Sequence, residues 1–411
     1  MKINYLEKVK VDKKKYVVSD FFKSASSIEN LAIKDGALKE GYRKNKVCNL
    51  SVAQTPIDIY CFNNDLFFFA KDEVYSVENG KASLLANANQ LDGASLYRIN
   101  YMGEKRTLLL CKDRAFFVDG QKEEVSLPYK KHGAVLGAKL FLGEGNTIAF
   151  GETNDLMGFS NSANTICLPE RLGEVVGIFP DGKELLIFCK SAVARLKAFG
   201  EGIDYQLEVQ DLPMLDVKEG SIVDVGNGFA FVNNNSLCLL KNKKVSELPT
   251  SVDLKEITFG KCARIGREVM LSYKTKEGNS YVLVKDIESG NEAVYNTDSV
   301  AVGCGGFMVS DNSICHLLEN EGESSGSALY ESLWADFNTS KSKALLTVMT
   351  DFSEPVKMEI FGDFGKKQFL MPKNSAVKKL NLRSKEFKFR VSCDKPFAVN
   401  EIAFEYKIKG E

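Results

Sequence analysis

A short phrase that ends in Leu-Pro recurs through the middle of the sequence and constrains its fold more than any other feature. The copies are Val125-Ser126-Leu127-Pro128, Ile166-Cys167-Leu168-Pro169, Gln210-Asp211-Leu212-Pro213 and Ser246-Glu247-Leu248-Pro249. Successive leucines lie 41, 44 and 36 residues apart, and weaker copies at residues 83–85, 293–295 and 328–330 extend the series. A period near forty residues is typical of repeat architectures.

Each repeat contains short apolar runs that are separated by turn residues. The first repeat has such runs at residues 57–62, 66–70, 73–77 and 82–85. Four strands of this length, joined by short turns, form an antiparallel meander. About seven such units predict a β-propeller, with six to eight blades compatible with the spacing. A pair of β-sandwiches is the alternative, because it shares the alternation of apolar residues, but it does not predict a period.

The Leu-Pro phrase also has an expected place within each unit. Proline has no backbone N–H and therefore suits a position where strand pairing stops. We expect the phrase to mark the end of a blade's outermost strand, where the chain crosses to the next blade. The prolines concerned are Pro128, Pro169, Pro213 and Pro249.

The two ends of the chain do not follow the repeat. Polar and small residues at 320–327 mark a boundary, and beyond them runs such as 356–361 alternate cleanly between apolar and charged residues. This alternation is typical of a β-sandwich with solvated outer faces. The predicted fold is all-β, a propeller of about seven four-stranded blades followed by a C-terminal β-sandwich. The expected segments are an N-terminal arm and hairpin at 1–50, the propeller at 51–319, a linker at 320–335 and the sandwich at 336–411.

Composition bounds the class of protein. The formal net charge is −1, so a globally basic nucleic-acid binder is not indicated. The ten cysteines are scattered, with no CxxC, and most fall in apolar runs, which favours free buried thiols and synthesis in a reducing cytoplasm. The N-terminus lacks an apolar signal-peptide core, and no apolar run approaches the roughly 18 residues that a membrane helix needs. We therefore expect a soluble protein without membrane insertion.

Residues capable of catalysis are few. His132 lies in a polar turn and is expected at the surface, whereas His316 follows an apolar pair and is expected to be buried or half-buried. The acids Asp65, Asp119 and Asp181 fall at turns, where a turn role suffices. The sequence has no HExxH and no phosphate-binding loop motif, and its one GxSxG match, at residues 322–326, falls in the polar stretch 320–327 and not in a strand-to-helix elbow. We expect no enzyme and no catalytic, metal or cofactor site.

The C-terminal region is basic, with 15 Lys and Arg against 9 Asp and Glu from residue 341 onward. A face of this kind could meet phosphates without sequence preference. The other interpretation is a solvated sandwich face whose lysines protect sheet edges from aggregation. The residues concerned are Lys378, Lys379, Arg383, Lys385, Lys388 and Arg390.

Two stretches resemble a known family. The opening runs Asn30-Leu31-Ala32-Ile33-Lys34-Asp35-Gly36-Ala37-Leu38 and continues to Gly41-Tyr42. The closing stretch consists of residues 383–391, 396–397, 402 and 404–410. Both are similar to the ends of head–tail connector, DNA-stabilisation and tail-nozzle proteins of tailed bacteriophages. The motif residues are Asn30, Asp35, Gly36, Leu38 and Gly41. The family usually has Arg-Pro-Gly after this opening, and Lys39-Glu40-Gly41 stands there in this chain.

The resemblance implies a structural role in a virion. A member of that family has a central β-propeller and forms a ring, often of six copies, beside portal, adaptor or tail proteins. Such a ring lines or closes the channel through which double-stranded DNA leaves, without a cofactor. The chain would then be assembled in the host cytoplasm and reside in the virion. The alternative function is a cytoplasmic β-propeller that serves as a protein–protein interaction module, and an enzyme ranks third.

Overall fold

The computed structural model describes residues 14–17, 25–34, 37–63, 65–88, 91, 93–119, 123–136, 139–152, 155, 158–159, 164–199, 204–210, 216–318, 327–337, 339–363 and 365–408. Its elements are β-strands and two short 3₁₀ helices, η1 (Val52–Gln54) and η2 (Glu170–Leu172). None of the described helices is long and apolar enough to cross a membrane. The chain divides into two compact units. We call Lys44–Gly290 with Asn296–Leu318 the propeller unit, and Met1–Arg43 with Asn291–Tyr295 and Glu319–Glu411 the sandwich unit.

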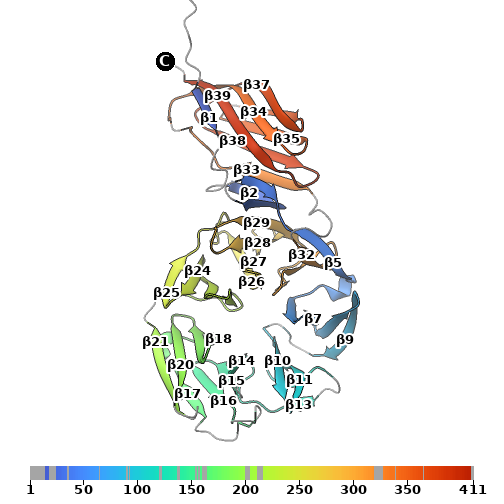
Figure 1. Ribbon diagram of the computed structural model, residues 1–411, viewed down its shortest axis with the longest axis vertical. Coiled ribbons are helices and arrows are strands. Elements are labelled where there is room, and N and C mark those ends of the chain that lie inside the picture. The colour runs from blue at the N-terminus through green and yellow to red at the C-terminus, as the bar shows by residue number, and fades with distance from the viewer. Residues whose placement is uncertain are drawn as a thin grey trace, which may run out of the picture. The chain divides into compact units, whose positions relative to one another are not determined.

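The propeller unit contains seven blades that follow one another around a ring (Figure 1). Each of the first three is a four-stranded antiparallel meander. Blade one is β6 (Asp58–Phe62), β7 (Asp65–Ala70), β8 (Glu73–Glu78) and β9 (Lys81–Asn87); blade two is β10 (Ser95–Tyr101), β11 (Glu104–Leu110), β12 (Ala115–Phe117) and β13 (Glu123–Val125); blade three is β14 (His132–Leu136), β15 (Lys139–Glu144), β16 (Thr147–Phe150) and β17 (Thr165–Cys167).

Blades four and five repeat this order, and blade six contributes three strands within this unit. Blade four is β18 (Val175–Asp181), β19 (Glu184–Cys189), β20 (Val193–Phe199) and β21 (Asp204–Gln210); blade five is β22 (Val223–Asp224), β23 (Phe229–Asn233), β24 (Ser236–Lys241) and β25 (Lys244–Glu247); blade six has β26 (Ile257–Ile265), β27 (Glu268–Thr275) and β28 (Ser280–Asp286). The propeller predicted from the forty-residue period is thereby confirmed.

Blade seven closes the ring with strands from both ends of the unit. Its inner strands are β30 (Val302–Gly303), β31 (Phe307–Ser310) and β32 (Ser313–Leu318), and its outermost strand is β5 (Arg43–Asn49). Buried Lys44 donates to Ser310 Oγ (2.9 Å) and to Asn296 O (3.0 Å). Residues 44–49 were assigned from sequence to an N-terminal arm, and the structure instead makes them a strand of the propeller.

The Leu-Pro phrase falls where the sequence predicts in the three copies that the structure describes. Pro128, Pro169 and Pro249 follow β13, β17 and β25, the outermost strands of their blades. Leu127 and Leu168 are buried, so the leucine anchors the crossing to the next blade. Pro213 lies outside the described residues. The weaker copy at residues 328–330 is different, because it belongs to a strand of the sandwich unit and ends no blade.

Apolar cores lie between adjacent blades. One cluster joins Ile59 and Phe68 of blade one to Val309 and Ile314 of blade seven, which completes the ring. Innermost strands converge toward the axis, and glycine allows this approach. A Cβ on Gly303 would lie 2.7 Å from Ile59 Cγ2, closer than side-chain carbons approach one another.

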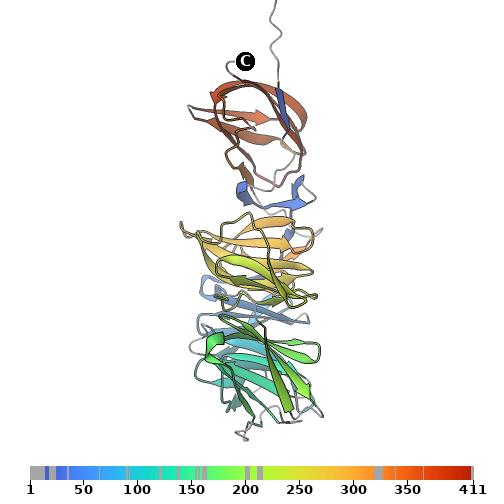
Figure 2. The same ribbon diagram turned by 90° about the vertical axis from the view of Figure 1, so that its left-hand side faces the viewer.

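The sandwich unit has two sheets that combine the two ends of the chain (Figures 1 and 2). One sheet runs in the order β2 (Ala25–Glu29), β33 (Ala328–Ser332), β38 (Phe387–Cys393), β35 (Val356–Gly362), β36 (Gly365–Met371). The other contains β29 (Glu292–Thr297), β3 (Leu31–Lys34), β4 (Ala37–Glu40), β39 (Val399–Ile408), β34 (Lys343–Phe352) and β37 (Asn374–Ser384), with β1 (Lys14–Val17) also paired to β39.

The limits of this unit differ from those expected. Strands β1 to β4 were predicted as a separate arm and hairpin, but they extend the two sandwich sheets. Strand β33 lies inside the predicted linker at 320–335. The predicted alternation is present, since β34 and β38 alternate between buried and less buried residues. An alternating pattern identifies a strand and its buried face, but it does not identify the strand's partner. Strands β1 and β4, for example, both pair with β39, more than 350 residues later in the sequence.

Candidate functional site

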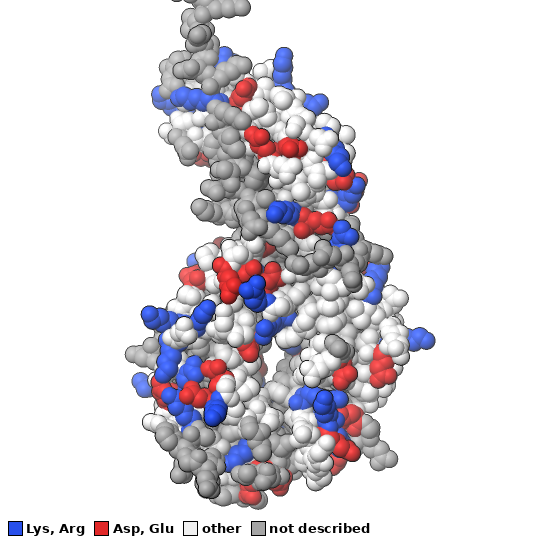
Figure 3. Space-filling view, viewed as in Figure 1, with Lys and Arg blue, Asp and Glu red and all other residues white. Residues whose placement is uncertain are grey.

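The main candidate site is a cavity of about 800 Å³ on the axis of the propeller (Figure 3). All seven blades contribute to it through their innermost strands or the residues just before them. Every blade begins at its innermost strand, so residues at the beginnings of these strands meet at one mouth of the axial channel. The polar side chains in the wall are Asp58, Tyr60, Ser95, Tyr97, Arg98, His132, Glu219 and Lys261.

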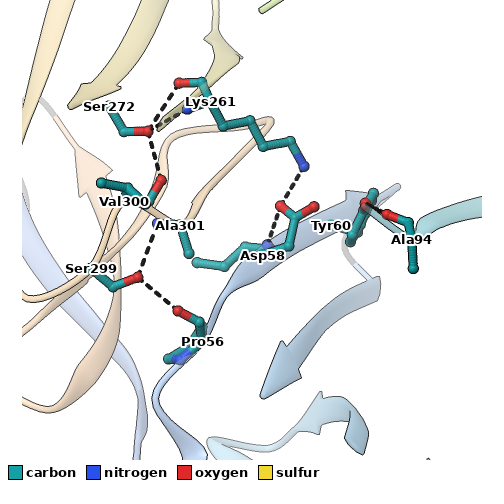
Figure 4. A network of polar contacts seen from close by, with 10 residues as sticks. Pro56, Asp58, Tyr60, Ala94, Lys261, Ser272, Ser299, Val300 and Ala301 are labelled. Carbon is teal, nitrogen blue, oxygen red and sulfur yellow. Dashed lines mark hydrogen bonds and ion pairs between the residues drawn. The ribbon is translucent and has the colours of Figure 1, made fainter. Parts of the chain in front are cut away.

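One side of the cavity holds an ion pair between blades one and six. Lys261 Nζ contacts Asp58 Oδ1, and it lies 4.2 Å from the centroid of the Tyr60 ring (Figure 4). The Asp58 and Lys261 side chains are 18% and 26% exposed, so water screens the pair only partly. Tyr60 donates its hydroxyl hydrogen to Ala94 O (3.1 Å), and burial raises the pKa of Tyr60 well above its ordinary value.

Two serines extend this contact across blade seven. Ser272 Oγ accepts from the Lys261 N–H (2.8 Å) and donates to Val300 O (2.6 Å). Ser299 Oγ accepts from the Ala301 N–H (3.0 Å) and donates to the carbonyl of Pro56 (2.7 Å). These bonds connect blades six, seven and one (Figure 4). We call Asp58, Lys261, Ser272 and Ser299 the closure clasp, because they join blades six, seven and one at the inner edge of the ring. Strand β5 closes the ring at its outer edge.

A second charged group lies between blades three and five. His132 begins β14, and its Nε2 lies 3.8 Å from Glu219 Oε1. Lys131 Nζ lies 3.0 Å from the other oxygen of the same carboxylate. His132 is only 8% exposed, and burial lowers its pKa to about 4, so the ring is neutral at pH 7. The expectation that His132 lies at the surface is wrong, because the apparent turn is the start of an innermost strand.

The remaining cation in the wall has its partners elsewhere. Arg98 lies 3.4 Å from Asp119 and 3.4 Å from Asp65, and Arg106 lies 3.2 Å from Asp119. Asp65 and Asp119 therefore form ion pairs with arginines in addition to their place in turns, and the sequence did not predict this role. His316 is half-buried as expected, and its ring stacks on Phe307 at 4.6 Å.

The arrangement in the cavity favours binding chemistry. It offers two carboxylates, each with a lysine, and one neutral imidazole. Within the described residues, no group of three His, Cys, Asp or Glu side chains is placed to hold a metal ion. Aligning the repeats could have located part of the site, since Asp58, Ser95 and His132 each begin an innermost strand.

The residues of the phage-like opening lie in the sandwich unit. Asn30 is buried, and its Nδ2 donates to Ser327 O (2.8 Å). Leu38 is fully buried in the same unit. Gly41 lies beneath the Tyr295 ring, where a Cβ would come 2.2 Å from the hydroxyl oxygen. Asp35 and Gly36 lie outside the described residues.

The six basic residues are divided between the two sheets and the turn that joins them. Lys378, Lys379 and Arg383 are exposed on β37, and Lys385 is exposed just after it. Lys388 and Arg390 lie on β38 of the other sheet, where both contact Glu331. Only the first four remain available as an exposed basic surface, which we call the β37 basic edge.

Sequence comparison assigns no family, because the chain matches no protein-family model and shows no significant similarity to a curated protein. Solved structures of similar fold include the Neurospora crassa Pan2 WD40 domain, with 8% identity, a TM-score of 0.45 and coverage of 68% of this chain and 94% of that one. A chain of the mitotic checkpoint complex has 12% identity and a TM-score of 0.42, covering 78% and 99%. PorZ, a type-IX secretion component of Porphyromonas gingivalis, has 12% identity and a TM-score of 0.41. The match covers 78% of this chain but only 46% of the PorZ chain. These likenesses concern the propeller fold alone.

Proposed function

We propose that this protein is a structural component of a bacteriophage virion, a ring-forming neck or tail protein that lines or closes the DNA exit channel. Its partners would be further copies of itself, in a ring of six, and the neighbouring portal, adaptor or tail proteins. Double-stranded DNA would pass without sequence-specific contact. The protein would be assembled in the host cytoplasm and remain in the virion.

The observation that supports this proposal is the common location of the two phage-like stretches. They lie at opposite ends of the sequence, yet both fold into the sandwich unit. Leu38 of β4 is the register partner of Val399 of β39, and β1 pairs with β39 over Lys14–Val17. The resemblance is confined to the two ends of the chain, and these ends form one folded unit. This pattern is expected if selection acted on that unit because of a role in assembly.

The construction of the propeller is also compatible with a mechanical role. Strand β5 closes the ring at its outer edge, and the closure clasp joins blades six, seven and one at the inner edge. Closure at both edges suits a part that must keep its shape within a larger assembly.

The test is the mass of the purified full chain by light scattering over a range of concentrations, alone and with the portal and adaptor proteins of the same phage. The proposal expects a single ring-sized species, or assembly of such a species upon addition of portal or adaptor rings. A chain that stays monomeric at high concentration and binds neither ring would contradict it.

The axial cavity favours one second candidate, a propeller that serves as a protein–protein interaction module. A buried neutral imidazole at the channel mouth is a feature that a bound segment of another protein could use. Recovery of one specific host protein on the full chain, lost on substitution of residues in the cavity wall, would favour this candidate over the ring.

A further inference from the structure

One side of the sandwich unit ends in two strands that lack a neighbour. Among the described residues, β37 is the last strand of its sheet and pairs only with β34, and β36 is the last strand of the other sheet and pairs only with β35. Only Pro372 and Lys373 separate β36 from β37, so both edges lie at the same side of the sandwich. Alternate backbone N–H and C=O groups of an edge strand point away from its one partner and are available to a further strand.

These two edges carry positive charge and no negative charge. Strands β36 and β37 contain five Lys and Arg residues and no Asp or Glu; the five are Lys366, Lys367, Lys378, Lys379 and Arg383. Lys366 contacts Glu359 at 3.3 Å. The three cations of β37, which form most of the β37 basic edge, are exposed and have no carboxylate partner among the described residues. Val377 on the same strand is 64% exposed, so the free border of β37 offers both unpaired cations and apolar surface.

One cation on each edge strand faces the core. Lys378 is the register partner of Val348, which is fully buried. Paired residues lie on the same face of a sheet, so Lys378 points inward and the next residue, Lys379, points outward. Lys367 has the equivalent position on β36, where its partner is buried Ile360. Inward-pointing lysines at a sheet edge prevent pairing with an uncharged strand, because the added strand would cover an unpaired ammonium group.

The charges determine which strand can be added. A second copy of this chain, paired through its own β37, would bring two wholly basic strands together, and like charges that lie opposite each other are destabilising. A strand with carboxylates opposite Lys378 and Lys379 would instead neutralise both cations, one on each face. An apolar residue opposite Val377 would cover its exposed side chain. The lysines therefore exclude most strands and admit an acidic one.

We propose that the free edge of β37, over residues 375–379, binds an extended acidic segment of a partner protein as an additional antiparallel strand. Beyond Lys379 the pairing with β34 is irregular and Asn381 has a φ of 53°, so the regular edge ends there. The partner segment reads Glu-Glu-apolar, opposite Lys379, Lys378 and Val377 in that order. This docking does not depend on ring formation, so its test and the light-scattering test can fail separately.

The probe is a capped peptide of sequence Thr-Thr-Glu-Glu-Val-Thr-Thr, titrated into the full chain. Amide hydrogen exchange, followed by mass spectrometry, should slow in β37 and stay unchanged in β25, the outermost strand of blade five. Peptides with two Gln or two Lys in place of the two Glu should give little or no protection. Unchanged exchange in β37 at millimolar peptide, or equal protection by the Gln peptide, would overturn the proposal.

The matched variants reverse charge at two exposed places. Lys378→Glu with Lys379→Glu should weaken the acidic peptide about tenfold or more, because two attractive pairs become repulsive. Lys241→Glu with Lys244→Glu, on β24 and β25, should not, although both of these lysines are also exposed. The Lys peptide should bind the β37 variant about as tightly as the acidic peptide binds the unaltered chain. Equal losses in the two variants, or no rescue by the Lys peptide, would contradict the proposal.

A short DNA duplex distinguishes this docking edge from a phosphate-binding surface. Duplex binding that is tighter than peptide binding and leaves exchange in β37 unchanged would show that the basic edge meets phosphates, and the proposal would be wrong. Displacement of the duplex by the acidic peptide, with exchange in β37 slowed, would support the proposal.

Discussion

The two charged groups in the axial cavity have the same layout, but they differ in how fully their polar atoms are paired and buried. Each joins residues of blades that are separated by one blade, blades six and one for Lys261 and Asp58, and blades three and five for His132 and Glu219. In the closure clasp, the ammonium has both a carboxylate and an aromatic ring. At His132, the ring nitrogen Nε2 has no hydrogen-bond partner among the described residues, and the nearby carboxylate of Glu219 pairs with the well exposed Lys131. We therefore expect the first group to hold the ring together and the second to contribute little to its stability.

The basic residues of the sandwich unit also divide into paired and exposed groups. Lys388 and Arg390 share the carboxylate of Glu331, which is only 10% exposed, whereas the β37 basic edge points to solvent. Lysines that look equivalent in the sequence therefore differ in what they contribute to stability. The following predictions test these contrasts, from the largest expected effect to the smallest.

Lys261→Met should lower the free energy of unfolding by about 2 to 3 kcal/mol, because it leaves the Asp58 carboxylate largely buried without its partner. Chemical denaturation measures the change. Lys131→Met is the matched control, since its pair with Glu219 is well exposed, and it should cost less than about 0.5 kcal/mol. Equal losses in the two variants would mean that the Lys261–Asp58 pair stabilises the ring no more than the exposed Lys131–Glu219 pair does.

The buried His132 should make stability depend on pH. Its pKa is lowered to about 4, below the ordinary value of 6.5. Between these two pH values, His132 binds a proton in the unfolded chain but not in the native chain. Stability should therefore fall as pH drops from about 6.5 toward 4, with about 2 kcal/mol lost by pH 5. His132→Asn should flatten this part of the profile in denaturant midpoints measured from pH 8 to pH 5. If His132→Asn left the pH profile of stability unchanged, the His132 imidazole would be exposed to solvent in the native protein, contrary to this prediction.

Lys388→Met should cost about 1 kcal/mol, because Glu331 keeps Arg390 but loses one of its two cations. Lys378→Met on the β37 basic edge should change stability by less than about 0.5 kcal/mol. Thermal or chemical unfolding of the two variants side by side measures the difference. The opposite ranking would mean that the exposed lysine is the structural one.

Glu219→Gln should have the smallest effect on folding, below about 0.5 kcal/mol, although it removes a charge from the cavity wall. Denaturation of this variant measures the effect, with Glu174→Gln as the control because its exposed carboxylate pairs with Lys190 outside the cavity wall. A loss of more than about 1 kcal/mol would show that Glu219 supports the ring.

The sequence predicts those features that local patterns determine. Period, turn residues and the Leu-Pro phrase identified the blades and the crossings at Pro128, Pro169 and Pro249, because a blade is a continuous meander. Long-range pairing was not predictable in this way. Strand β5 completes a blade begun by Val302, and Asp58 meets Lys261 over 203 positions of sequence. No local pattern encodes such partners.

The same reason explains the error at His132. Lys130, Lys131 and Gly133 make its surroundings polar or flexible in the sequence, which indicates a turn. The residue is buried because the strands of other blades converge on the axis around it. Only an alignment of the repeats, with His132 beside Asp58 and Ser95, would have placed it in the channel.

The central claim is that the Lys261–Asp58 pair holds the ring together and that the Lys131–Glu219 pair does not. The most direct measurement is a double-mutant cycle for each pair by chemical denaturation, with Lys261→Met and Asp58→Asn in one cycle and Lys131→Met and Glu219→Gln in the other. We expect a coupling energy of about 2 kcal/mol for the first pair and below about 0.5 kcal/mol for the second. Equal coupling energies in the two cycles would contradict the account.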